Sequence, residues 1–132
     1  PLFNKKELNH LIELANWIVV NEYEANLLSE TTESSIGEIA KRVQAMVITK
    51  GASGSEIIVN AEIIPIDPVK AATEADPTGC GDAFRAALIY GICNEMSWEE
   101  MGRLGSLMGS IKVAKHGTQN HSFTLEELLH QL

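Results

Sequence analysis

The chain has 132 residues, of which 45% are hydrophobic, so it can bury one core, and a single domain over 1–132 is expected. It carries 18 acidic against 10 basic residues, and this net charge of −8 argues against nucleic acid and anionic membrane surfaces as partners. No apolar run approaches transmembrane length, no signal-peptide pattern is visible, and two cysteines are too few for a disulfide framework, so a cytoplasmic protein is expected.

The first half of the sequence predicts a β-α-β unit. A helix is expected from about Asn4 to Leu14, and the apolar run 17–20 that follows it is typical of a buried parallel strand. Ser35 and Glu38 have the spacing of a capping box, which predicts a helix that leads into another buried strand at 46–49.

The second half predicts two short strands followed by helices. The expected elements are strands near 56–59 and 62–66, a helix from Asp82 to about Glu95, a helix that begins after Ser97 and ends at 115–116, and a last short helix from Thr124. This alternation indicates an α/β fold. The strands 17–20 and 46–49 carry polar motifs at their carboxyl ends, where open parallel sheets bind ligands, so both motifs are expected at one sheet edge.

The most informative segment is 76–82, Asp-Pro-Thr-Gly-Cys-Gly-Asp, which precedes a helix rich in small residues. Unpaired backbone N–H groups of Gly79, Cys80 and Gly81 in the first turn of that helix would favour an anion such as phosphate. Asp82 would project from the same turn as a carboxylate that takes a proton from an attacking hydroxyl, a pattern typical of phosphoryl transfer. The same residues also fit a tight loop followed by an ordinary first-turn acid.

The segment 76–82 resembles the second signature of the PfkB-type (ribokinase-like) carbohydrate and nucleoside kinases, Asp-Thr-x-Gly-Ala-Gly-Asp, with Pro77 in place of Thr and Cys80 in place of Ala. Neither change removes the glycines or the final aspartate. The resemblance implies that Asp82 is the catalytic base and that 79–81 form the anion hole. Within the family, the chain is similar to a bacterial group described as adenosine kinases in two stretches, DPTGCGDAFRA and RLGSLMGSIKVAKHGTQNH.

A second motif of the family, Asn-x-x-Glu, is matched by Asn21 and Glu24 directly after the first strand. In the family these side chains help to hold Mg²⁺ and its waters beside the nucleotide phosphates, and Mg²⁺ needs only one or two protein carboxylates. The same spacing also fits a helix N-cap at Asn21 with Glu24 as its capping-box partner.

The stretch TKGASG after the second strand resembles the nucleotide loop of the family, Thr-x-Gly-x-x-Gly. The resemblance implies that Thr49 and Gly51 approach the phosphates or ribose of ATP, with Lys50, Ser53 and Gly54 as further nucleotide-binding candidates. A strand, a glycine-containing turn and another strand also fit a simple hairpin, and both interpretations can hold together.

Two more positions resemble family sites near the nucleotide. Gly117-Thr118-Gln119 resembles a Gly-Ala-Gln turn close to the adenine and to a monovalent-cation site, which makes Gly117 a nucleotide-binding candidate. Asp76 and Thr78 match positions implicated in the same cation site, so K⁺ is a candidate cofactor beside ATP and Mg²⁺.

The resemblance implies the C-terminal part of a ribokinase-like three-layer α/β/α fold, with a largely parallel sheet and a β-hairpin. The N-terminal substrate and lid portion of the family is expected to be absent. A fragment of this kind is expected to fold, to form homo-oligomers through its unpaired strand edge and apolar surface, and to be catalytically silent.

The expected activity of the intact protein is ATP-dependent phosphorylation of a primary hydroxyl, with adenosine as the first candidate acceptor and a sugar as the second. One alternative is a thiol enzyme that uses Cys80, because a helix N-terminus lowers a thiol pKa, but no His or Asn stands at a spacing that suggests a partner. The other alternative is a non-catalytic nucleotide-binding or dimer-forming protein.

Overall fold

The computed structural model describes residues 4–68 and 80–114. In chain order the elements are α1 (Lys5–Leu14), β1 (Trp17–Asn21), α2 (Glu22–Thr32), α3 (Ile36–Ala40), β2 (Ala45–Thr49), the 3₁₀ turn η1 (Gly51–Ser53), β3 (Ser55–Val59), β4 (Glu62–Ile66), α4 (Cys80–Cys93) and α5 (Trp98–Ala114). The expected strands and the first helix are confirmed, and α4 begins two residues before the predicted start at Asp82. The predicted end of α5 at 115–116 and the last helix from Thr124 lie outside the described residues.

The sheet in this part of the chain is mixed and has the strand order β1-β2-β3-β4. β1 and β2 are parallel and joined through α2 and α3, whereas β2–β3 and β3–β4 are antiparallel. The expected α/β class and hairpin are confirmed, but the described strands are not largely parallel. The physical reason lies in the connections, because the short turns after β2 and β3 permit only antiparallel pairing. Asn60 and Ala61, both at positive φ, close the β3–β4 turn.

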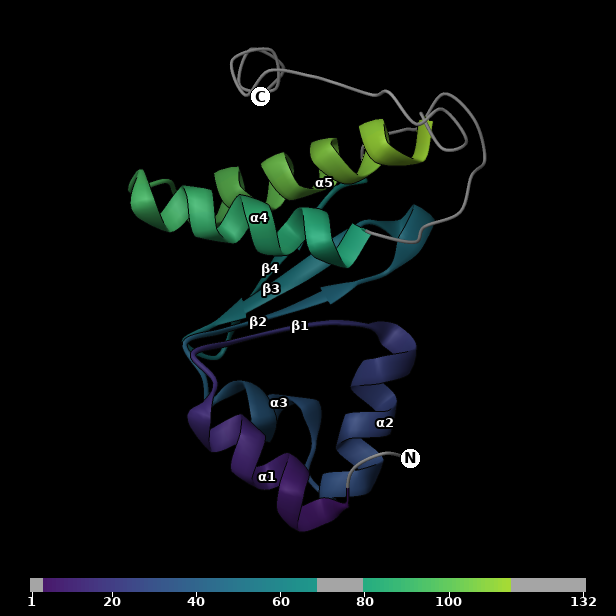
Figure 1. Ribbon diagram of the computed structural model, residues 1–132, viewed down its shortest axis with the longest axis vertical. Coiled ribbons are helices and arrows are strands. Elements are labelled where there is room, and N and C mark those ends of the chain that lie inside the picture. Colours follow the sequence, from purple (N-terminus) through teal and green to yellow (C-terminus); the bar gives the residue numbers. More distant parts are fainter. Residues whose placement is uncertain (1–3, 69–79, 115–132) are drawn as a thin grey trace.

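Helices cover both faces of the sheet, which gives the expected three layers (Figure 1). α1, α2 and α3 lie on one face and α4 and α5 on the other. β2 is buried on both sides, since Met46 and Ile48 belong to the core under α1–α3 and Val47 belongs to the core under α4 and α5. The sheet is therefore the wall between two separate hydrophobic cores.

Capping boxes define where four of the described helices begin. The predicted box Ser35–Glu38 is confirmed at the start of α3, and the predicted helix start after Ser97 is confirmed by a box between Ser97 and Glu100 at the start of α5. The hydrogen bond from the backbone N–H of Ser97 holds the pKa of Glu100 below its usual range, and the hydroxyl of Ser97 adds to this effect. α1 and α2 start in the same way, at Asn4 and Asn21.

Glycines allow α5 to lie close to its neighbours. A Cβ at Gly105 would stand 2.6 Å from the ring of Phe84 on α4, and a Cβ at Gly102 would stand 2.5 Å from the side chain of Ile66 on β4. These contacts fix α5 on both α4 and the β3–β4 hairpin. Among the described helices, none is long and apolar enough to cross a membrane.

Candidate functional site

A row of three polar residues crosses the carboxyl edge of the sheet. Asn21 at the end of β1 pairs in register with Thr49 at the end of β2, and Thr49 pairs with Ser55 at the start of β3. Val47 and Ile57, two positions away from Thr49 and Ser55, belong to the core beneath α4 and α5. Because side chains alternate along a strand, the row faces the α4 side of the sheet.

Ser55 is the residue in this row that no motif identifies. Its side chain is 3% exposed, and its hydroxyl has no hydrogen-bond partner in the structure as described. A buried hydroxyl normally has a hydrogen-bond partner, so Ser55 places an unpaired polar group inside this edge of the sheet. Sequence inspection could not find it, because its place opposite Thr49 depends on strand pairing rather than on a local pattern.

Asn21 and Glu24 form a complete capping box at the start of α2. The Asn21 side-chain oxygen accepts a hydrogen bond of 2.7 Å from the backbone N–H of Glu24, and the Glu24 carboxylate accepts one of 3.0 Å from the backbone N–H of Asn21. Both residues are exposed. The helix-cap interpretation is therefore confirmed, and the metal interpretation stays a prediction that the cap does not contradict, since each oxygen can accept more than one contact.

The loop between β2 and β3 is a tight turn closed by backbone hydrogen bonds. The N–H of Lys50 donates to the carbonyl of Gly54 at 2.8 Å, and the N–H of Gly54 donates to the carbonyl of Gly51 at 3.1 Å. Ser53 ends the 3₁₀ turn and is exposed. Thr49, the last residue of β2, is half-buried beside this turn.

The two glycines of the loop are required for different reasons. Gly51 has φ of 56° and nothing within 4 Å of the position of a Cβ, so its backbone is open to a close approach from outside. Gly54 has φ of 91°, and a Cβ there would stand 2.2 Å from the carbonyl oxygen of Ile66 on β4. Gly51 is thus the open position of the loop and Gly54 is the packing position.

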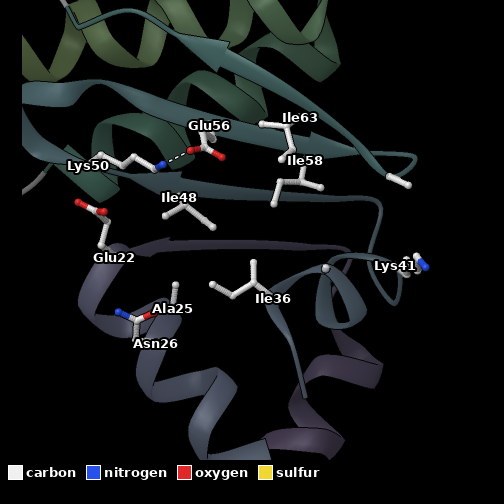
Figure 2. A pocket seen from close by; sticks show the side chains of 12 residues that line it. Glu22, Ala25, Asn26, Ile36, Lys41, Ile48, Lys50, Glu56, Ile58 and Ile63 are labelled. Carbon is white, nitrogen blue, oxygen red and sulfur yellow. Dashed lines mark hydrogen bonds and ion pairs between the residues drawn. The ribbon is translucent and has the colours of Figure 1, made fainter. Parts of the chain in front are cut away.

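Lys50 turns away from the polar row. Its ammonium group forms an ion pair with the carboxylate of Glu56 on β3 (Figure 2). Both side chains line the face of the sheet on which α2 and α3 lie. The lysine is about 29% exposed at its side chain and its charge is already paired.

The start of α4 lies at the same edge of the sheet as the polar row (Figure 1). Cys80, Gly81 and Asp82 occupy its first turn, and their side chains are not described. One turn later, Phe84 is buried in the core and the Arg85 guanidinium donates a 3.4 Å hydrogen bond to a carbonyl of β1. These contacts fix the first turns of α4 over the carboxyl half of β1.

Four predicted site residues lie outside the described part of the chain, and the structure gives them no position. They are Asp76, Thr78, Gly79 and Gly117.

Three features lie at one edge of this three-layer α/β/α architecture: a glycine loop after one strand, a capped helix after the parallel neighbouring strand, and the start of another helix. This combination is typical of nucleotide-binding proteins. Residues 1–125 match the family model described as pfkB family carbohydrate kinase, and the chain belongs to that family.

Three relatives show how the chain compares with known proteins. A solved structure of Burkholderia thailandensis nucleoside kinase in complex with inosine matches 99% of the chain at 46% identity with a TM-score of 0.91, over 44% of its own chain. The nucleoside kinase of Methanocaldococcus jannaschii is 30% identical over the whole chain, which covers 44% of its length. The ribokinase of Mus musculus is 33% identical over 118 residues, 81% of this chain and 36% of its own length. The chain therefore spans less than half the length of these relatives.

The difference between the two loop glycines gives a testable prediction. Gly54→Ala is expected to lower the free energy of unfolding by about 3 kcal/mol, because a disfavoured φ is combined with a backbone clash that no side chain can relieve. Gly51→Ala is expected to lower it by only about 1 kcal/mol, the cost of a left-handed backbone in open space. Urea unfolding of the two variants, followed by circular dichroism, measures the difference, and equal losses would contradict the assignment.

Proposed function

We propose that the full-length protein transfers a phosphoryl group from ATP to the primary hydroxyl of a nucleoside. The observation that carries the proposal is the meeting of the β2–β3 loop, the capped start of α2 and the first turn of α4 at one sheet edge, in a chain of the pfkB family. A phosphoryl-transfer site needs backbone donors, a base and a place for a cation within one small region. In this proposal the first turn of α4 would supply the donors and the base, the start of α2 would supply the place for the cation, and the β2–β3 loop would contact the nucleotide.

Asp82 is the proposed general base. It lies in the first turn of α4, the helix whose next turns are held over β1 by Phe84 and Arg85. The carboxylate would accept the proton of the acceptor hydroxyl, while the N–H groups of 79–81 would stabilise the charge that develops on the transferring group. Bound ATP would supply the phosphoryl group that is transferred.

The β2–β3 loop is the proposed nucleotide contact. Thr49 faces the α4 side of the sheet, and the open backbone of Gly51 permits a close approach by a phosphate or a ribose. Ser53 and Gly54 shape the turn, and Gly117 is proposed to close the adenine end. Lys50 is the least favoured of these candidates because Glu56 already neutralises it.

Asn21 and Glu24 fit a Mg²⁺ ion that keeps most of its waters. Within residues 4–68 and 80–114 no three His, Cys, Asp or Glu side chains cluster as a metal site, so the ion would take most of its ligands from water and phosphate. The exposed Glu24 carboxylate would hold those waters, and Mg²⁺ would add charge neutralisation at the phosphates when bound. Asp76 and Thr78 remain the proposed residues for K⁺.

The acceptor is proposed to be a nucleoside, with adenosine first. Support comes from the nucleoside kinase of Burkholderia thailandensis, solved with inosine, which is 46% identical to this chain. A sugar is the second candidate, favoured by the 33% identity to mouse ribokinase. Because the chain spans less than half of these relatives, acceptor-binding groups are also expected from sequence beyond it.

An acceptor panel tests the proposed function. The full-length protein is incubated with ATP and Mg²⁺ and with adenosine, inosine, ribose or fructose, and ADP release is followed by a coupled assay. We expect kcat/KM for a nucleoside to exceed that for either sugar by at least about 100-fold, since a site built for a base loses those contacts with a free sugar. Preference for ribose would support the sugar alternative, and no turnover with any acceptor would contradict kinase activity.

The base assignment is tested by Asp82→Asn in the full-length protein. We expect kcat to fall by about 10²- to 10⁴-fold, the usual loss for a general base, while the affinity for ATP changes little because the two side chains are nearly isosteric. Cys80→Ala is the matched control two residues away, and it should retain activity if the thiol only replaces an alanine. Near-normal turnover of Asp82→Asn would refute the assignment, and loss of activity in Cys80→Ala would favour thiol chemistry.

The metal role of Glu24 can be separated from its role in the helix cap. Glu24→Gln keeps an oxygen that can complete the capping box but removes the charge, so the free energy of unfolding should stay within about 0.5 kcal/mol of the original. The Mg²⁺ concentration that gives half-maximal activity should rise about 10- to 100-fold. Glu38→Gln makes the same change in the capping box of α3, remote from the proposed site, and should leave the Mg²⁺ dependence unaltered. If Glu24→Gln and Glu38→Gln showed the same Mg²⁺ dependence, the role of Glu24 would be confined to capping the helix.

A further inference from the structure

Ser55, at the start of β3, keeps a hydroxyl group inside the protein with no hydrogen-bond partner among the residues that the structure describes. Its side chain is 3% exposed, so a ligand at the sheet edge does not reach this hydroxyl directly. An unpaired buried hydroxyl destabilises a fold, because it loses its contact with water and gains no bond in return. An alanine would avoid that loss, so stability alone does not explain a serine at this position.

Thr49 is the polar neighbour of Ser55 in the sheet. Ser55 pairs with Thr49 on β2 and with Ile66 on β4, and Ile57 follows two residues later on the same face. The two isoleucines belong to the core beneath α4 and α5. Of these three neighbours, Thr49 alone has a side chain that can form a hydrogen bond.

The pairing of β2 with β3 brings the two hydroxyl-bearing side chains close together. The N–H of Lys50 donates a 2.8 Å hydrogen bond to the carbonyl of Gly54, which makes these two residues a hydrogen-bonded pair of the antiparallel ladder. Because hydrogen-bonded and non-hydrogen-bonded pairs alternate, Thr49 and Ser55 form a non-hydrogen-bonded pair, the kind whose facing side chains lie closer. The Cβ atoms of a facing pair are about 4.5–5.5 Å apart, a separation that two hydroxyl groups can bridge with a hydrogen bond.

The backbone of Ser55 is fixed, whereas its hydroxyl is free to turn. β3 lies between β2 and β4, and a Cβ at Gly54 would overlap the backbone of Ile66, so the chain enters β3 in close contact with β4. A serine hydroxyl has three staggered positions, while β-branched Thr49 is more restricted about χ1. Ser55 can therefore direct its hydroxyl at Thr49 without a movement of the backbone.

We propose that Ser55 is a positioning residue, which orients the hydroxyl of Thr49 towards a phosphate oxygen of the nucleotide. This role rests on the proposed function, in which the β2–β3 loop contacts the nucleotide. The Ser55 O–H donates to the oxygen of half-buried Thr49, and the Thr49 O–H donates to the phosphate. An ionised phosphate oxygen only accepts hydrogen bonds, so Thr49 must be the donor to it, and the bond from Ser55 leaves the Thr49 proton for the ligand. Two hydroxyl groups in series polarise each other, which strengthens the outer hydrogen bond.

The charge of the loop makes this orientation important. Lys50 and Glu56 alternate with Thr49 and Ser55 along the two strands, and their ion pair lies on the opposite face of the sheet (Figure 2). A phosphate beside Thr49 is therefore bound mainly by neutral donors. A neutral hydroxyl contributes only when its proton faces the acceptor, so its orientation decides its contribution to binding.

The stability and the nucleotide affinity of Ser55→Ala, measured in the full-length protein, test the proposal. The substitution removes an unpaired buried hydroxyl, so the urea midpoint of the ligand-free protein should not fall. The Kd of ATP, measured by calorimetry, should rise about fivefold to tenfold, and the KM for ATP should rise by a similar factor while the KM for the acceptor stays within about twofold. A serine with only a structural role would give the reverse result, a lower midpoint and an unchanged Kd.

A double-mutant cycle shows whether the effect passes through Thr49. Thr49→Val keeps the shape of the side chain without its hydroxyl, and we expect it to raise the Kd of ATP about tenfold. Ser55→Ala added to Thr49→Val should change the Kd by less than about twofold, because no hydroxyl is left to orient.

Thr32→Val is the matched control for the loss of a buried hydroxyl. Thr32 is 2% exposed, and its hydroxyl donates a 2.7 Å hydrogen bond to the carbonyl of Leu28 at the far end of α2 from the site. Its removal should leave the Kd of ATP unchanged.

The possible failures are distinguishable. If the protein phosphorylates its acceptor but Ser55→Ala leaves the Kd of ATP unchanged, or if its effect is additive with that of Thr49→Val, the positioning role is wrong and the proposed function stands. A raised Kd accompanied by a lower urea midpoint would indicate damage to the loop and would also overturn the positioning role. No binding of ATP to the original protein would overturn this role together with the proposed function.

Discussion

The burial of β2 on both faces is the constraint on which the candidate site depends. Residues 45–48 are all buried, and Met46, Val47 and Ile48 alternate between the two hydrophobic cores. A shift of one residue in the pairing of β2 would exchange the core positions of Val47 and Ile48, so the register is strongly fixed. Because β1 and β3 both pair with β2, this register also places Asn21 and Ser55 on either side of Thr49.

Local signals were sufficient to predict much of the fold. The capping boxes at Ser35 and Ser97 and the apolar runs of β1 and β2 depend on residues a few positions apart, and the structure confirms them. A cap at the start of α2 was one of two interpretations of Asn21 and Glu24, because the same spacing fits both a capping box and the metal motif of the family.

Features that depend on pairing across strands could not be predicted in the same way. The mixed direction of the sheet, the buried hydroxyl of Ser55 and the ion pair between Lys50 and Glu56 all arise where separate strands meet. The candidate site was therefore predicted as a set of motifs, and the register that joins Asn21 to Thr49 came only from the structure.

The loop after β2 shows how one short motif can combine unlike requirements. Gly51 leaves the backbone open, whereas Gly54 allows the turn to lie against Ile66. A sequence pattern records both as glycine and hides the difference. The distinction matters for any account of the family loop, because a change at one position alters what can approach and a change at the other alters the fold.

The ion pair between Lys50 and Glu56 has a consequence for the way in which an anion would reach this edge. With the lysine neutralised by its neighbour, the β2–β3 loop carries no net charge, and the whole chain has a charge of −8. Long-range electrostatics of this chain therefore do not attract a negatively charged ligand and act against its approach. Recognition at the loop would instead come from backbone dipoles that act only at contact distance.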